Sequence, residues 1–333
     1  MSAYLGVDGG GSKTALLLVD DSGQVLASHT EGPAYYLEIG LDAMRAMLAR
    51  GIGIILKRAQ LAPSDLNYTF LGLPAYGEDS GLLSALDSAA SPLLPPTQYR
   101  CGNDAVCGWA GALACQDGIN VVAGTGSIAY GEFDDRTARA GGWGELFSDE
   151  GSAYWLARAG LNLFSRMSDG RATRSALYDL LRKHFGLRAD LDLCAAIYAE
   201  TQNRRSTIAS LAPLLAQAAI AGDMQVSALF DRAADELVQI VDAVYLKLEV
   251  PKHLPVTVST TGGMFQQRDL LLRRFHSKLA IHSARYRAAE PRLTPAAGAA
   301  LYAAKLSGAP LSANAIAVLE AQLQAKNAIY DSF

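Results

Sequence analysis

The stretch GVDGGGSKT, residues 6–14, decides how the beginning of this chain folds. An apolar run at residues 4–7 leads into its glycines, and a second apolar run follows at residues 15–19. A DDSG turn then connects to residues 24–29, so three short strands are joined by tight turns. We therefore predict an antiparallel meander. Its first turn offers backbone amides to an anion, because glycine lets the main chain approach closely.

Two other interpretations of this turn compete with anion binding by a hairpin. A Walker-type phosphate loop needs the pattern GxxxxGK[ST], but Ser12 stands between Gly11 and Lys13. A Walker loop also opens a helix, whereas the residues that follow here have the pattern of a strand. A glycine hairpin without any ligand remains an alternative.

The opening pattern recurs near residue 119. An apolar strand at residues 120–123 precedes the turn GTGS, and residues 128–133 form a return strand. This repetition predicts two related α/β domains that face each other across a cleft, with boundaries at residues 1–118 and 119–333. Residues 150–247 have helical patterns and form an expected insertion in the second domain. The last predicted helix, about 313–328, is expected to pack back on the first domain.

Composition excludes several classes of function. The chain has 333 residues, of which 50% are hydrophobic, enough for two cores. Its formal net charge of −4 argues against nucleic acid and against an anionic membrane surface as partners. No apolar window reaches the roughly 20 residues of a membrane span, and no export signal opens the chain. We expect a cytoplasmic protein with a small-molecule partner, whose four cysteines are buried free thiols.

Two further segments carry candidate site residues. Asp104 lies between a proline-rich stretch and a run of small residues, where it is either a functional carboxylate or the N-cap of a helix. The block GGWGELFSDEGSAYW, residues 141–155, combines glycine, carboxylates and aromatic rings. That mixture suits a polyol, because carboxylates accept hydroxyl hydrogen bonds and aromatic faces cover C–H surface. Alternatively, Ser148 or Asp149 only caps the next helix.

Taken in order, GVDGGGSKT, NDA, GTGS, GGWG, SDEGSAYW and TTGG resemble the N-acetylglucosamine kinase and benzoyl-CoA reductase activator family of the actin, sugar kinase and Hsp70 superfamily. The resemblance runs from Gly6 to about Ala304. It implies an α/β fold of two actin-like, ribonuclease H-like domains. It also implies an ATP- and Mg²⁺-dependent kinase that phosphorylates the 6-hydroxyl of N-acetylglucosamine, and a homodimer.

The same resemblance implies a role for each matching residue. Asp8 would lie near Mg²⁺ and the phosphates, and Asp104 would be the catalytic base that deprotonates the sugar hydroxyl. Three further sets are implied: phosphate contacts from Gly10, Gly11, Ser12, Lys13, Thr14, Thr125, Gly126 and Ser127; adenosine contacts from Gly262 and Gly263; and sugar contacts from Gly142, Trp143 and Asp149.

One segment departs from the family pattern. Family members carry an asparagine-containing segment after the first meander, and this chain has PAYYL at residues 33–37. Tyr35 and Tyr36 are therefore expected to stack on the sugar or to shift its identity. A glucosamine kinase, a non-kinase ATPase activator that works on a redox partner, and a sensor that has lost turnover remain alternatives. The activator would be expected to show cysteines that bridge a dimer through an iron–sulfur cluster.

Overall fold

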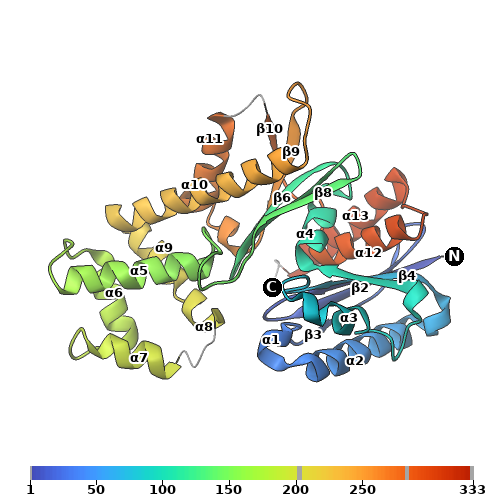
Figure 1. The fold of residues 1–333 in the computed structure, drawn as a ribbon, viewed down its shortest axis with the longest axis horizontal. Helices are drawn as coiled ribbons and strands as arrows, with labels where there is room; N and C mark the ends of the chain where they lie inside the picture. Colours follow the sequence, from blue (N-terminus) through green and yellow to red (C-terminus); the bar gives the residue numbers. More distant parts are fainter. Residues whose placement is uncertain (1, 201–204, 282–284, 331–333) are drawn as a thin grey trace. The chain divides into compact units, whose positions relative to one another are not determined.

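The computed structural model describes residues 2–200, 205–281 and 285–330, which form two compact units. The first unit contains residues 1–120 and 290–333, and the second contains residues 121–289. The expected α/β fold is confirmed, since each unit is built on a five-stranded sheet covered by helices (Figure 1). The chain thus leaves the first unit once, completes the second, and returns.

The sheet of the first unit has the strand order β3-β2-β1-β4-β5. The predicted meander is confirmed, because β1 pairs antiparallel with β2 and β2 with β3. Strand β4 pairs parallel with β1, and β5 pairs parallel with β4. The strands are β1 (Ala3–Gly9), β2 (Thr14–Asp20), β3 (Val25–Glu31), β4 (Leu66–Leu73) and β5 (Tyr99–Asn103).

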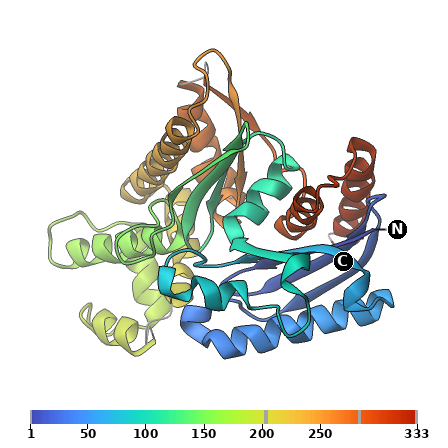
Figure 2. The same ribbon diagram turned by 45° about the vertical axis from the view of Figure 1, so that its right-hand side comes forward.

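Alternation along β1 separates two helical layers. Leu5 and Val7 belong to a core shared with Met44 and Leu48 of α2, whereas Gly6 lies against the backbone of α12. Figures 1 and 2 show α2 along one face of the sheet and α4 with α12 on the other. The helices are α1 (Tyr36–Ile39), α2 (Leu41–Ala59), α3 (Leu83–Asp87), α4 (Asp104–Leu113), α12 (Pro295–Leu306) and α13 (Ala313–Tyr330).

The C-terminal helices belong to the first unit. The alanine-rich α12 is almost entirely buried and packs against α4 and β1. From α13, the Gln322 side chain accepts a hydrogen bond from the Val25 amide at 3.2 Å. The units therefore divide differently from the expected boundaries of 1–118 and 119–333, because small side chains let α12 approach the first sheet closely.

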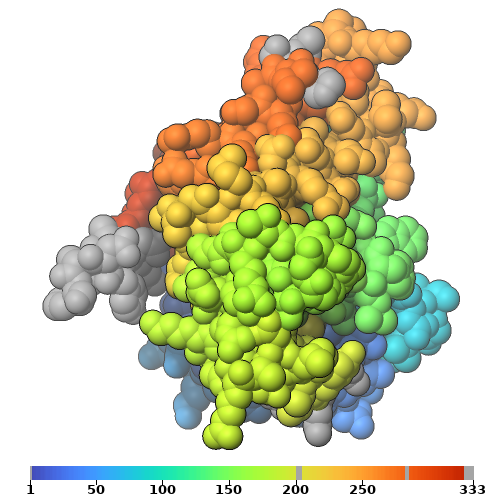
Figure 3. Space-filling model, turned by 90° about the vertical axis from the view of Figure 1, so that its left-hand side faces the viewer, coloured from blue at the N-terminus to red at the C-terminus, as the bar shows by residue number. Residues whose placement is uncertain are grey.

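The second unit contains the sheet β10-β9-β6-β7-β8. Its strands are β6 (Gly118–Ala123), β7 (Ser127–Phe133), β8 (Arg136–Gly141), β9 (Val256–Thr261) and β10 (Tyr286–Ala289). A helical segment lies between β8 and β9, as predicted, and Figure 3 shows its outer surface in green and yellow. Its helices are α5 (Ala153–Ser168), α6 (Ala176–Phe185), α7 (Asp192–Glu200), α8 (Arg205–Ala209), α9 (Ala212–Ile220) and α10 (Met224–Lys247).

The remaining elements are short. Helix α11 (Arg273–Ile281) precedes β10 in the chain, after a π-helical turn at Arg268–Leu272. Single 3₁₀ turns occur at Pro63–Asp65, Ser80–Leu82, Pro96–Gln98 and Gly263–Gln266. None of the described helices combines the length and apolarity needed to cross a membrane.

The cysteines differ from the expected set of buried thiols. Cys101 and Cys107 are buried and Cys115 is half-buried, but Cys194 is exposed. It lies on α7, where Leu193 is the one residue buried among those whose burial is described. All four are free thiols.

Candidate active site

Two aspartates lie at the same edge of the first sheet. Asp8 is the penultimate residue of β1, and Asp104 directly follows β5. The parallel register aligns Asp8 with Gly72 on β4, and the next β4 residue, Leu73, with Asn103 on β5. Because parallel strands end at one edge, the fold brings together carboxylates that are separated by 95 other residues in the sequence.

The electrostatics of Asp8 reflect this placement. The pKa of Asp8 is raised to about 8, first by burial and then by the neighbouring Asp104 carboxylate, while Lys13 opposes the shift. The buried Cys107 thiol beneath them also has a raised pKa, first from burial and then from the same two carboxylates. Ionising both carboxyls at this buried edge is therefore unfavourable, and a divalent cation bound there would stabilise their charged forms.

Asp104 is not the helix N-cap. The cap of α4 is Asn103, whose side-chain oxygen accepts the Ala105 amide at 3.0 Å. Asp104 is the first helical residue and is only partly buried. The capping interpretation of Asp104 is therefore wrong.

The first glycine turn is tied together by its own backbone. The Gly10 amide donates to the Lys13 carbonyl at 3.0 Å, and Gly11, Ser12 and Lys13 are exposed or partly exposed. Thr14 differs from the others, because its hydroxyl is fully buried and donates to the Gly32 carbonyl at 2.8 Å. A phosphate contact through the Thr14 side chain would require this bond to break.

The two tyrosines after the meander have different environments. Tyr36 is buried in the core of the first unit, and its hydroxyl donates to the Ala75 carbonyl at 3.5 Å. Stacking of Tyr36 on a sugar is therefore wrong for this structure. Tyr35 is half-buried and occupies the N-cap position of α1, so only Tyr35 retains the predicted role.

The second glycine turn is braced by helix α5. The amides of Ala153 and Tyr154 donate to the carbonyls of Gly124 and Thr125 at 2.9 and 3.3 Å. Within the turn, the Gly124 amide donates to the Gly126 carbonyl at 2.9 Å. Among the described residues, the amides of Thr125 and Gly126 have no hydrogen-bond partner. The turn thus offers two donors to an anion.

Asp149 is the buried carboxylate beside this turn. Its side chain is 2% exposed, its backbone is left-handed with φ of 60°, and one oxygen accepts the Ser127 amide at 3.4 Å. The N-cap of α5 is Ser152, which accepts the Trp155 amide at 3.1 Å. Capping of α5 by Ser148 or Asp149 is therefore wrong, because the helix begins at Ala153.

Arg205 is a candidate site residue that sequence reasoning missed. Its guanidinium donates a hydrogen bond to the Asp149 carboxylate, and its Nε lies 3.7 Å from a carboxylate oxygen of Glu145. Burial raises the pKa of Asp149, while Arg205 and then the Ser127 amide oppose the shift. No motif marks Arg205, because its contact with residue 149 depends on the packing of α8 against α5.

The remaining predicted residues lie on loops of the second unit. Trp143 is 69% exposed and follows Gly142 in the loop after β8, where Leu146 and Phe147 are also exposed. Gly262, with φ of 101°, approaches the Ala123 backbone so closely that a side chain would not fit. The predicted adenosine contacts, Gly262 and Gly263, therefore lie next to the strand that leads into the second glycine turn.

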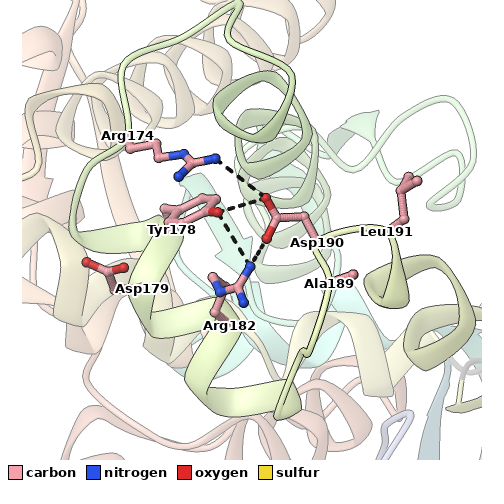
Figure 4. Close-up of a pocket in the computed structure, with 7 residues that line it drawn as sticks. All are labelled: Arg174, Tyr178, Asp179, Arg182, Ala189, Asp190 and Leu191. Atoms are coloured by element: carbon pink, nitrogen blue, oxygen red, sulfur yellow. Dashed lines mark hydrogen bonds and ion pairs between the residues drawn. The ribbon is translucent and has the colours of Figure 1, made fainter.

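A pocket of about 590 Å³ lies elsewhere in the second unit (Figure 4). Its lining includes Arg174, Tyr178, Arg182 and Asp190, and none of the predicted site residues. Asp190 accepts hydrogen bonds from the Tyr178 hydroxyl at 2.7 Å and from the Arg182 guanidinium. These groups satisfy one another, so we interpret the pocket as a structural ion-pair network of α6 and the loop after it.

Residues for a magnesium ion are few. Within residues 2–200, 205–281 and 285–330, no cluster of three or more His, Cys, Asp or Glu side chains could hold a metal ion. Mg²⁺ in phosphoryl-transfer sites is bound by one or two carboxylates together with substrate phosphates. The Asp8 and Asp104 pair fits that mode and does not form a cage made of protein alone.

Comparison with known proteins gives a consistent picture. The sequence pattern of the BadF/BadG/BcrA/BcrD ATPase family matches residues 5–303. An N-acetyl-D-glucosamine kinase of Dictyostelium discoideum is 26% identical over 309 residues, covering 90% of this chain and 97% of the relative. An N-acetylmuramic acid/N-acetylglucosamine kinase of Clostridium acetobutylicum is 28% identical over 283 residues, covering 85% and 92%. A solved structure from Chromobacterium violaceum, provisionally named N-acetylglucosamine kinase, superposes with a TM-score of 0.72 at 26% identity, covering 90% and 98%.

Proposed function

Because the chain belongs to the BadF/BadG/BcrA/BcrD ATPase family, we propose that it is an ATP-dependent amino-sugar kinase that phosphorylates the 6-hydroxyl of N-acetylglucosamine. The relatives named above, which act on amino sugars, support the substrate class. The observation that carries the proposal is the placement of Asp8 and Asp104 at one sheet edge, with Asn103 and not Asp104 as the cap of α4.

Asp104 is the proposed general base. Phosphoryl transfer needs little covalent help from the protein, so a base contributes mainly by orienting the acceptor hydroxyl and taking its proton. A carboxylate at the first position of a helix is held on a rigid element. Its neighbour Asp8 is proposed to hold Mg²⁺, which would supply charge stabilisation at the phosphates.

Asp149 and its loop are the proposed sugar contacts. A buried carboxylate accepts hydrogen bonds from hydroxyls that every candidate sugar shares. Gly142 and Trp143 lie on the preceding loop, where the exposed indole is able to cover the apolar face of a sugar. Tyr35, in the first unit, is the proposed residue that adjusts the choice among amino sugars.

The two glycine turns are the proposed phosphate contacts. The second turn has two amides without a partner among the described residues, and the space beside Gly124 is open close to the backbone. Gly10, Gly11, Ser12 and Lys13 would contribute the first turn, and Gly262 and Gly263 would contact adenosine. All of these assignments depend on the proposal that the protein uses ATP.

A coupled kinase assay tests the proposal. Purified protein with ATP and Mg²⁺ is assayed against N-acetylglucosamine, glucosamine, N-acetylmuramic acid and glucose. We expect the highest kcat/KM for N-acetylglucosamine and no turnover of 6-deoxy-N-acetylglucosamine, which lacks the acceptor hydroxyl. Turnover of the 6-deoxy sugar would exclude the 6-hydroxyl. A higher kcat/KM for glucosamine would instead support the alternative substrate suggested by the PAYYL segment.

A further inference from the structure

The guanidinium of Arg205 lies on the second glycine turn. A Cβ added at Gly126 would meet Arg205 Nη2 first and the Asp149 carboxylate next, at 2.7 Å. Such an atom at Gly124 would meet nothing within 4 Å. The space that glycine leaves open at residue 126 is thus filled by a cation from α8, beside two turn amides that have no partner among the described residues.

Within the described part of the chain, the donors of Arg205 are incompletely used. An arginine carries five N–H donors, and its hydrogen bond to a described residue goes to Asp149. Its Nε is buried and lacks a hydrogen-bond acceptor in the described part of the chain, with the Glu145 carboxylate 3.7 Å away. Unused donors of a guanidinium next to unused backbone amides form a site suited to phosphate oxygens.

A purely structural ion pair in the same unit looks different. Arg182 pairs with Asp190 and also donates to the carbonyls of Leu187 and Arg188 at 3.2 and 3.3 Å. Asp190 also accepts from the Ser168 hydroxyl at 2.8 Å. There the protein satisfies both partners, whereas Arg205 retains donors and lies at a glycine turn. Arg205 thus differs from the structural Arg182 in keeping donors that no described residue uses.

We infer that Arg205 binds the terminal phosphates of the nucleotide and couples them, through its pair with Asp149, to the sugar-binding carboxylate. This inference rests on the proposed function. When phosphate oxygens reach the turn, the guanidinium is shared between them and Asp149. Arg205 would therefore favour nucleotides with more phosphates, and it would link occupation of the nucleotide site to the charge beside the sugar.

Calorimetric titration of the intact chain tests the inference without turnover. A non-hydrolysable ATP analogue, ADP and AMP are titrated with Mg²⁺ into wild type, Arg205→Gln, Arg205→Lys and the control Arg182→Gln. We expect Arg205→Gln to weaken binding of the ATP analogue roughly 10- to 100-fold and AMP by less than about twofold. Arg205→Lys keeps the positive charge but lacks the forked pair of guanidinium donors. Its loss of affinity should therefore be intermediate and should depend on the number of phosphates in the same way.

The control separates binding from folding. Arg182→Gln removes a somewhat more exposed arginine–aspartate pair of the same unit, so it should lower the thermal midpoint yet leave the three affinities unchanged. Equal affinity losses for the ATP analogue and AMP in both Arg205 variants would overturn the phosphate role, and so would unchanged affinities. If Arg205→Gln does not fold, Arg205→Lys alone decides by the same criterion. Failure of wild type to bind the ATP analogue would overturn the proposed function itself, and this inference with it.

Discussion

Each unit holds a buried or partly buried aspartate, and the two aspartates have opposite kinds of charged neighbour. Asp8 in the first unit lies beside another carboxylate, Asp104, and burial raises its pKa to about 8. Asp149 in the second unit is even less exposed, but it is paired with Arg205 and accepts a backbone amide. At the first site Asp8 is held in its protonated form below about pH 8, whereas at the second site an arginine pairs with the carboxylate.

This difference in charged neighbours indicates which kind of ligand each site would bind. A carboxylate without a bound cation is stabilised by the arrival of a proton or a metal ion, so the first site is suited to Mg²⁺ and proton transfer. A carboxylate that already has an arginine needs no external charge. The second site is therefore suited to neutral hydroxyls, together with phosphates that the arginine attracts.

Removal of the base should have the largest effect. Asp104→Asn keeps the shape of the site but cannot accept a proton, so kcat should fall by about 10² or more while nucleotide affinity is retained. Steady-state kinetics and nucleotide titration measure the two quantities. Asp42→Asn, an exposed carboxylate of the same unit, is the control. Near-normal kcat in Asp104→Asn would remove this residue from the mechanism.

The pH dependence of stability tests the charge at Asp8. The unfolded chain loses this proton near pH 3.8, whereas the folded protein retains it up to about pH 8. The contribution of Asp8 to the free energy of unfolding therefore falls as pH rises between these values. In urea unfolding without nucleotide or metal, Asp8→Asn should lose less stability than wild type between pH 5 and pH 8, by an amount on the order of a few kcal/mol. Parallel pH profiles would show that Asp8 has an ordinary pKa.

Removal of the second carboxylate's charge should affect binding more than chemistry. Asp149→Asn weakens hydroxyl contacts common to all candidate sugars, so KM should rise roughly tenfold for each of them while kcat changes less than in Asp104→Asn. The matched control is Asp190→Asn, because Asp190 is also paired with an arginine but lies in the separate network of Figure 4. That variant should change the thermal midpoint and not the sugar KM. The reverse pattern would assign Asp149 a structural role.

Substitutions at Gly124 and Gly126, two glycines of the second turn, should have the smallest effects and test the use of the space beside each. Valine at residue 126 would displace Arg205 in addition to blocking a phosphate, so alanine is the sharper substitution. Gly126→Ala should weaken nucleotide binding roughly fivefold, because its methyl group competes with the guanidinium for space. Gly124→Ala, which has open space, should change the affinity less than twofold. Equal effects at both positions would mean that the space at residue 126 has no special use.

The sequence predicts what depends on local patterns. The meander and both glycine turns follow from apolar runs and glycine spacing within a few residues, and Asp104 was a candidate because of its position before a run of small residues. Strand β8, with the sequence RTARAG, has no comparable pattern, since its strand conformation comes from pairing with β7. The burial of Tyr36 and the pair of Arg205 with Asp149 depend on tertiary packing, which local patterns do not encode.

The alternative that Asp104 and Asp149 only cap helices is wrong for the same reason in both cases. Each helix begins with a neighbouring residue as cap, Asn103 for α4 and Ser152 for α5, so neither Asp104 nor Asp149 is needed there. Helix boundaries are uncertain by one or two residues in sequence analysis. The cap of α5 lies three residues after Asp149, and the cap of α4 lies one residue before Asp104.

The return of the chain to the first unit has a consequence for synthesis. Translation proceeds from the N-terminus, so all of residues 121–289 is synthesised before α12. Until then, the face of the first sheet that α12 covers, including Gly6, lacks its helical cover. The first unit is thus unable to complete its fold until residues 121–289 have been made. Nascent chains halted before residue 295 would expose apolar surface of the first unit, a natural binding site for chaperones.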